Sequence, residues 1–230
     1  MVEDAMLQSV LVGLDPHREL IGQIAGLLTV LQYLAGCFTC AEIHRRRSSE
    51  GVSPVRFIGG CSLSVLQLQY FRKLQSSSLV ATSICTLSFS VLYTLWFLWY
   101  TPAASRGPFY RKALGATAVT AALCAFGSQA NDPVTLHRLG LIITVLALIF
   151  IALPLAQLRK VIRAKSTAGL PLPAILASTG ASVLWLVYGL LLHNSFIVLQ
   201  KTIALALCAA QLCLFIIYPA TGPSEGKKKQ

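Results

Sequence analysis

The sequence predicts an all-α integral membrane protein with seven transmembrane helices, arranged as two parallel three-helix bundles joined by a linker helix (3+1+3). The first observation is composition: 55% of the 230 residues are hydrophobic and 12% are charged, about half the charged fraction of a soluble domain. The second is that apolar runs of about 20 residues, the length that crosses a bilayer core, recur along the chain. The third is an internal repeat with a spacing of 118 residues.

The apolar runs predict seven spans, at residues 20–43, 55–71, 79–100, 113–129, 139–158, 172–192 and 196–218. The fourth gives the weakest signal, because it is rich in alanine and other small residues. Grouped by the repeat, the spans predict five regions: an N-terminal segment (1–19), a first repeat (20–100), a linker helix with its loops (101–138), a second repeat (139–219) and a basic tail (220–230).

Basic residues gather on one side of the predicted bundle. Fourteen of the 19 lysines and arginines fall on the side of the C-terminus, which the positive-inside rule places in the cytosol, with the N-terminus outside or in a lumen. The tail lysines are typical of a retrieval signal or an anionic-lipid contact, so we expect the plasma membrane and/or the Golgi, with membrane lipid as a partner. The fourteen are Arg45, Arg46, Arg47, Arg56, Arg106, Arg111, Lys112, Arg159, Lys160, Arg163, Lys165, Lys227, Lys228 and Lys229.

The repeat becomes visible when the chain is slid against itself by 118 residues. Because this shift skips an odd number of spans, both copies have the same orientation in the membrane. Parallel repeats around an axis normal to the membrane mark one class of transporter, whose substrate site lies near the midplane between the copies. The matches include Arg45 with Arg163, Arg47 with Lys165, Leu66 with Leu184, and Tyr70 with Tyr188.

No pattern of a catalytic, cofactor or metal site is visible in the sequence. Cys37 and Cys40 form a CxxC, but no second CxxC or histidine accompanies it within the span, so small apolar residues are the better interpretation. A nucleophile–His–acid set and a Gly-rich phosphate loop are also missing, so we expect neither an enzyme nor a cofactor. The basic residues lie in short loops between the spans rather than on one continuous basic face, which argues against a nucleic-acid partner.

The second copy carries the most specific pattern. Residues 154–167 read Pro-x-x-x-x-x-x-Val-Ile-x-x-Lys-Ser-Thr, and a proline and Trp-x-x-Tyr-Gly follow by residue 189. Together with the 3+1+3 plan, this pattern resembles the SWEET sugar transporters over residues 20–219, strongly in the second copy and weakly in the first. The resemblance implies a passive, bidirectional transporter of mono- or disaccharides that works by alternating access without a coupling ion. It also implies a homo-oligomer.

The resemblance assigns hinges to prolines beside the basic turns. Pro154 and Pro171 match this pattern in the second copy. The first copy holds Gly36 at the position that corresponds to Pro154, and Arg56 close to the position that corresponds to Pro171. Glycine keeps the backbone flexible, and Pro54, two residues before Arg56, substitutes in part.

The resemblance also implies a sugar site built from aromatic and small polar side chains, with one Asn from the third helix of each copy. Trp185 matches the aromatic position, where a ring face and an N–H suit a sugar, and its first-copy partner is Gln67. The Asn positions hold Ser83 and Lys201. Ser83 either binds sugar or packs helices, and Lys201 either lines the site or extends to the outer interface. Gln200, next to Lys201, is a candidate to supply the amide that the Asn positions lack here.

Tyr70 and Asn194 match the positions where the family closes its external gate with a Tyr–Asp pair. Because the acid is an amide here, we expect a neutral and weaker hydrogen bond. The alternative is that Tyr70 is an ordinary interfacial aromatic residue.

Two other functions remain open at this stage. A non-transporting adaptor or trafficking protein of the same fold would show the loss of both asparagines. A facilitator of a non-sugar, anionic solute would show a lysine such as Lys201 inside a span.

Overall fold

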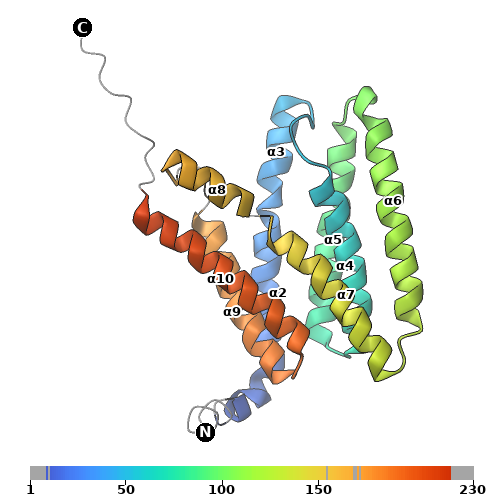
Figure 1. The fold of residues 1–230 in the computed structure, drawn as a ribbon, viewed down its shortest axis with the longest axis vertical. Coiled ribbons are helices and arrows are strands. Elements are labelled where there is room, and N and C mark those ends of the chain that lie inside the picture. The colour runs from blue at the N-terminus through green and yellow to red at the C-terminus, as the bar shows by residue number, and fades with distance from the viewer. Residues whose placement is uncertain (1–8, 10, 154, 168–169, 171, 219–230) are drawn as a thin grey trace.

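The protein is a bundle of helices in a computed structural model that describes residues 9, 11–153, 155–167, 170 and 172–218 (Figure 1). No strand occurs among these residues, so the all-α prediction is confirmed. The elements are η1 (Asp15–His17), α2 (Arg18–Leu34), α3 (Gly36–Arg46), α4 (Val55–Lys73), α5 (Ser77–Trp99), α6 (Ala103–Ser128), α7 (Pro133–Ile151), α8 (Leu155–Ala164), α9 (Leu172–Leu191) and α10 (Ser195–Ile217).

Each predicted span corresponds to a helix or a pair of helices. Among the described residues, five segments are long and apolar enough to cross a membrane: Leu11–Arg46, Ser77–Trp99, Pro133–Ile151, Leu172–Leu191 and Ser195–Ile217. The remaining two spans are α4 and α6, which are less apolar because each carries basic residues, and α4 also carries serines and glutamines. The linker helix α6 begins at Ala103 rather than at residue 113, so most of the loop predicted before it is helical.

The two repeats have the same internal order. In the first repeat α5 packs against both α2 and α4, and in the second α10 packs against both α7 and α9. The main contacts between the repeats are α2 with α9 and α4 with α7, while α6 packs on α4 and α7 (Figure 1). Both cross-repeat contacts therefore join the first helix of one copy to the second helix of the other, as a two-fold axis between parallel copies requires.

Backbone geometry confirms the repeat at individual residues. The described residues other than glycine that have a positive φ are Arg47 (55°), Gln75 (53°), Lys165 (49°) and His193 (50°). They form two pairs separated by 118 residues, Arg47 with Lys165 and Gln75 with His193. Each ends or follows a helix, where a left-handed residue commonly closes the last turn.

Where the structure describes the residue before a helix, three helices begin with a side-chain cap. Ser76 accepts a hydrogen bond from the N–H of Leu79 at the start of α5, and Asn194 accepts one from the N–H of Ile197 at the start of α10. Asp132 does the same for α7 through Thr135, and the hydrogen bonds from Thr135 hold the pKa of the Asp132 carboxyl below its usual value. Caps satisfy N–H groups that the helix itself leaves unbonded.

The first helix of each repeat is interrupted at matching positions. The break between α2 and α3 falls at Ala35, beside the predicted hinge Gly36, and the break between α7 and α8 follows Ile151. A Cβ on Gly36 would lie 2.5 Å from the ring of Tyr93, so this position needs glycine. The predicted hinges Pro154 and Pro171 lie outside the described residues, and Pro54 directly precedes α4.

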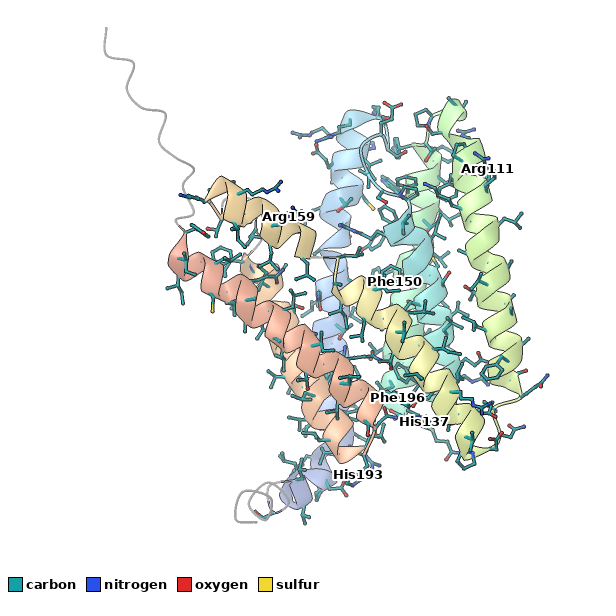
Figure 2. All side chains as sticks on the ribbon, viewed as in Figure 1. Arg111, His137, Phe150, Arg159, His193 and Phe196 are labelled. Carbon is teal, nitrogen blue, oxygen red and sulfur yellow. The ribbon has the colours of Figure 1, made fainter. Side chains whose placement is uncertain are left out.

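The bundle has two ends, which we name by their residues. The basic end carries Arg45, Arg46, Arg47, Arg106, Arg163 and Lys165, and the N-terminal end carries η1 and the α4–α5, α6–α7 and α9–α10 turns. Figure 1 shows the two repeats diverging toward the basic end, where α3 and α8 lie apart. Figure 2 places Arg111 and Arg159 in the half of the bundle nearer the basic end, and His137, His193 and Phe196 near the N-terminal end.

Candidate substrate pathway between the repeats

Tyr70 and Asn194 meet across the two repeats at the N-terminal end. The Asn194 amide Nδ2 donates to the Tyr70 hydroxyl at 3.0 Å, while Asn194 Oδ1 accepts from the N–H of Ile197 at 3.0 Å. Both side chains are buried, with 4% of Tyr70 and 9% of Asn194 exposed. The two predicted gate residues are therefore in contact, through a neutral hydrogen bond.

Trp185 lies at the contact between α9 and α2. Its ring is buried, its indole Nε1 donates to Thr29 Oγ1 at 2.8 Å, and the Thr29 hydroxyl donates to the carbonyl of Ala25 at 2.8 Å. The Tyr188 ring meets Trp185 edge to face, with centroids 5.4 Å apart. The sequence prediction named Trp185 but missed Thr29, which is one of the few hydroxyls of the first span.

Lys201 lies on the inner face of α10. It follows Asn194 by seven residues and Ile197 by four, the spacing of neighbours on one helix face, and Ile197 belongs to the buried cluster that contains Trp185. Lys201 is half-buried, and its two-fold counterpart Ser83 is buried in α5. The ion pairs of the described residues involve Arg18, Arg45 and Arg46, and none involves Lys201.

The two glutamines differ in their surroundings. Gln200 is buried, and its Nε2 donates to Thr144 Oγ1 at 2.9 Å, which ties α10 to α7 inside the second repeat. Its amide is thus already engaged within one repeat. Gln67 is half-buried in α4, at the two-fold position of Trp185.

A hydroxyl cluster in the first repeat was not predicted. The Tyr33 hydroxyl at the end of α2 lies near the hydroxyls of Ser64, Thr86 and Ser90, and all three of these residues are buried. The two-fold counterparts are Ile151, Ser182, Ala204 and Cys208, which keep a single hydroxyl. This hydroxyl cluster is therefore a feature of the first repeat.

At the basic end, side-chain hydrogen bonds join helices of the same repeat. Trp96 Nε1 donates to the carbonyl of Cys40 at 3.0 Å, and the Tyr93 hydroxyl donates to the carbonyl of Tyr33 at 2.7 Å, so α5 holds both halves of the first helix. The turns that follow behave alike: the N–H of Ser49 donates to the carbonyl of Tyr100 at 3.1 Å, and Thr167 Oγ1 donates to the carbonyl of Tyr218 at 3.4 Å.

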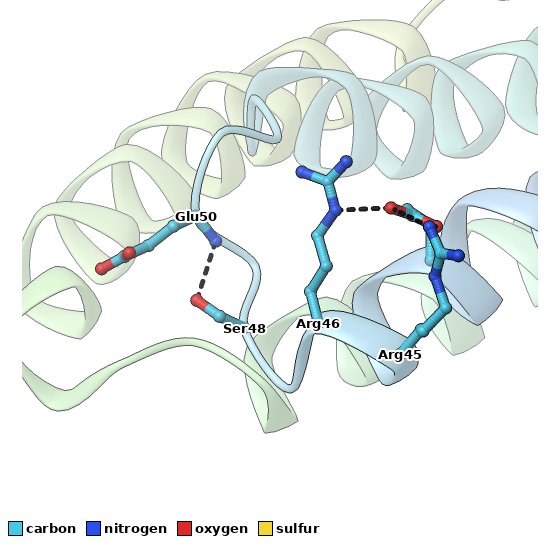
Figure 3. A network of polar contacts seen from close by, with 5 residues as sticks. Arg45, Arg46, Ser48 and Glu50 are labelled. Carbon is cyan, nitrogen blue, oxygen red and sulfur yellow. Dashed lines mark hydrogen bonds and ion pairs between the residues drawn. The ribbon is translucent and has the colours of Figure 1, made fainter.

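The turn after α3 is organised by local polar contacts. Arg45 and Arg46 both pair with the carboxylate of Glu42, and the Ser48 hydroxyl accepts from the N–H of Glu50 at 3.2 Å (Figure 3). The contacts stay within helix α3 and its turn.

A close contact joins α4 of the first repeat to α7 of the second. The Phe150 ring packs against Gly59, where any side chain would collide with it.

A pocket of about 470 Å³ opens at the N-terminal end of the second repeat. Its lining comes from the end of α9, the α9–α10 turn and the start of α10, including His193, Asn194 and Thr202. It therefore lies beside the Tyr70–Asn194 contact rather than near Trp185 and Thr29.

The comparison with known proteins agrees with this arrangement. The family model described as "Sugar efflux transporter for intercellular exchange" matches residues 19–105 and 137–222, one segment for each repeat. "Sugar transporter SWEET1" from Drosophila pseudoobscura pseudoobscura is 31% identical over 206 residues, which is 87% of this chain and 89% of that protein. "Bidirectional sugar transporter SWEET10" from Arabidopsis thaliana is 27% identical over 87% of this chain and 71% of that protein.

A solved structure gives the same fold. "The 3.7 A resolution structure of a eukaryotic SWEET transporter" superposes with a TM-score of 0.80 at 21% identity, covering 89% of this chain and 99% of that chain. Seven transmembrane helices in the 3+1+3 arrangement are the architecture of that protein, and the predicted fold class is confirmed. By its two matched segments, its relatives and its fold, the chain belongs to the SWEET family, the sugar efflux transporters for intercellular exchange, whose members are transporters and not enzymes.

Proposed function

We propose that this protein is a passive sugar transporter that carries mono- or disaccharides in both directions, by alternating access between its two repeats. The observation that carries the proposal is the Tyr70–Asn194 hydrogen bond, which closes the N-terminal end between repeats, while α3 and α8 pack within their own repeats at the other end. Both relatives described above are named as sugar transporters, and the one from Arabidopsis thaliana is named as bidirectional.

The breaks in the first helix of each repeat give this motion a place to occur. Gly36 and the segment that follows Ile151 separate the half-helices α3 and α8 from the parts that make the cross-repeat contacts. In the proposed cycle, the basic end closes by movement at these breaks while the N-terminal end opens. The hinge roles of Gly36, Pro54, Pro154 and Pro171 belong to this proposal.

The chemistry near the middle of the bundle suits a neutral polyol. A sugar needs hydroxyl partners and an apolar surface for its ring face, and Trp185 with Thr29, Ser83 and the Tyr33 cluster supply both kinds. The sequence has no Asp or Glu between residues 51 and 131 or between 133 and 224. A proton-coupled cycle would have no carboxylate to use in those spans, which favours passive flow.

The same proposal gives an orientation. By the positive-inside rule, the excess of arginine and lysine at the basic end supports a cytosolic position for that end, and a position outside or in a lumen for the N-terminal end. The proposed membranes are the plasma membrane and/or the Golgi, and the proposed assembly is a homo-oligomer. Cysteine accessibility to an impermeant reagent in intact cells, with labels at Gln75 and at Ser48, tests the orientation directly.

The central experiment is uptake and counterflow of radiolabelled glucose in proteoliposomes. We expect saturable flux in both directions, lost in Trp185→Ala and retained in the control Trp99→Ala, whose ring is 79% exposed. Normal flux in Trp185→Ala would overturn the site. Absence of glucose, sucrose and trehalose flux by well-folded protein would favour a non-transporting adaptor of the same fold.

A second candidate substrate follows from Lys201. A lysine within a span, without an acid partner among the described residues, is suited to an anionic solute such as a sugar acid. Competition of glucose flux by glucuronate measures this directly: strong inhibition that is lost in Lys201→Asn supports the anion, and no inhibition supports neutral sugars.

A further inference from the structure

A second hydrogen bond crosses between the repeats at the N-terminal end. The hydroxyls of Tyr188 and Ser76 lie 2.6 Å apart, and both residues are buried, with none of Tyr188 and 3% of Ser76 exposed. Tyr188 belongs to α9 of the second repeat, and Ser76 caps α5 of the first. Either hydroxyl can be the donor.

This contact is the two-fold image of the Tyr70–Asn194 contact. Tyr188 follows Tyr70 by 118 residues, and Asn194 follows Ser76 by the same interval. In both cases the tyrosine comes from the second helix of one repeat, and its partner is the N-cap of the third helix of the other repeat. The symmetry therefore extends to the atoms that bond.

Each of the two tyrosines also packs against a glycine of the opposite repeat. A Cβ on Gly22 would lie 2.6 Å from the Tyr188 ring, and a Cβ on Gly140 would lie 3.0 Å from the Tyr70 hydroxyl. Gly22 and Gly140 are again 118 residues apart, on the first helix of the repeat opposite each tyrosine. Each tyrosine thus inserts between the first and third helices of the other repeat, in a space that only glycine leaves open.

We infer that Tyr188–Ser76 and Tyr70–Asn194 are two equivalent latches, by which we mean contacts that hold the repeats together at the N-terminal end. The N-terminal end opens only when both latches break. The inference rests on the proposed alternating-access cycle, in which contacts between repeats at this end must separate. Ser76 and Asn194 also accept hydrogen bonds from the N–H groups of Leu79 and Ile197, and these cap bonds do not involve the tyrosines. Breaking either latch therefore leaves α5 and α10 capped. The only groups that need a new hydrogen-bond partner, such as water, are the hydroxyls and the amide that formed the latch.

The competing possibility is that Tyr188 is a fixed packing residue. It lies in the cluster with Ala25, Trp185 and Ile197, at the α2–α9 contact. If that contact persists through the whole cycle, the Tyr188–Ser76 bond never breaks and its loss would not change the balance between the closed and open states. The two possibilities differ in a distance at the N-terminal end, not in sugar flux.

The test measures that distance without any sugar. Spin labels are placed at Gln75 and His193, which are exposed and two-fold related, in protein with its seven cysteines replaced and reconstituted in nanodiscs. The variants are Tyr70→Phe, Tyr188→Phe and their combination. Tyr110→Phe, on the exposed side of α6, is the matched control.

We expect each latch variant to raise the ratio of long to short distances by about threefold to tenfold, the range for one lost hydrogen bond, with a larger rise in the combination. Ser76→Asn, which keeps both the cap and a donor for Tyr188, should stay closed. If Tyr70→Phe shifts the distances and Tyr188→Phe does not, the second latch is refuted. If neither single variant nor the combination shifts them, both latches are refuted, whatever the sugar assay shows.

Discussion

The indole N–H of Trp185 is bonded to the Thr29 hydroxyl, 156 residues away in the sequence, across the largest contact between the repeats. A ring N–H that is buried and paired in this way fixes the side chain. In the proposed transport cycle, a sugar that reaches this region would meet an aromatic ring already fixed in place and a hydroxyl that can exchange partners.

Replacing Thr29 by valine should expose the cost of an unpaired indole N–H. The shape is conserved, but the buried donor loses its acceptor, which costs about 1–3 kcal/mol. Thermal unfolding in detergent should show a lower midpoint. Thr120→Val is the control, because that hydroxyl donates only to the carbonyl of Ala116 in its own helix, and an equal loss in both variants would contradict the pairing.

Replacing Lys201 by asparagine should keep or raise the flux of neutral sugars. The change removes a costly ammonium from the span and adds both a donor and an acceptor. Initial rates of glucose uptake at matched protein density in the liposomes measure it. A folded but inactive variant would mean that the lysine itself is required.

Replacing Gly36 by alanine should lower stability and slow flux. The added Cβ meets the Tyr93 ring at 2.5 Å, and overpacking of this kind costs about 1–3 kcal/mol. Gly115→Ala in α6 is the matched control, since no atom outside its own helix lies within 4 Å of the added Cβ, and there a small gain in stability is expected. Equal unfolding midpoints for the two variants would rule out the steric explanation.

Replacing Gln200 by leucine should weaken the attachment of α10 to α7, and Thr144→Val should partly restore it. Removing one partner leaves a buried group unpaired at about 1–3 kcal/mol, whereas removing both is close to neutral. A double-mutant cycle on unfolding midpoints checks this. Additive losses, together with a raised KM for sugar in Gln200→Leu alone, would instead place Gln200 in the sugar site.

The sequence was sufficient for those features that depend on composition or on the 118-residue spacing. The seven spans and the equal orientation of the copies are of this kind, whereas the meeting of Tyr70 with Asn194 was implied by the resemblance to the SWEET transporters. The Tyr188–Ser76 contact follows from the same spacing once one of the two pairs is known. It was missed because Ser76 is one of four consecutive polar residues, 75–78, and gives no signal of its own.

Other features depend on how helices are rotated, which spacing does not determine. The partner of Trp185 depends on which face of α2 meets α9, and the engagement of Gln200 depends on which face of α10 meets α7. The early start of α6 was missed because basic residues near a membrane surface are compatible with either a loop or a helix. The roles of the site residues in binding sugar stay predictions.

The left-handed turns at Gln75 and His193 have a practical consequence for anyone purifying this protein. A side chain with a Cβ in that conformation costs about 1–2 kcal/mol, part of which glycine recovers despite its greater freedom in the unfolded chain. Both positions are exposed, so Gln75→Gly and His193→Gly remove strain without touching the interior. The pair is a starting point for a heat-tolerant form of the same transporter.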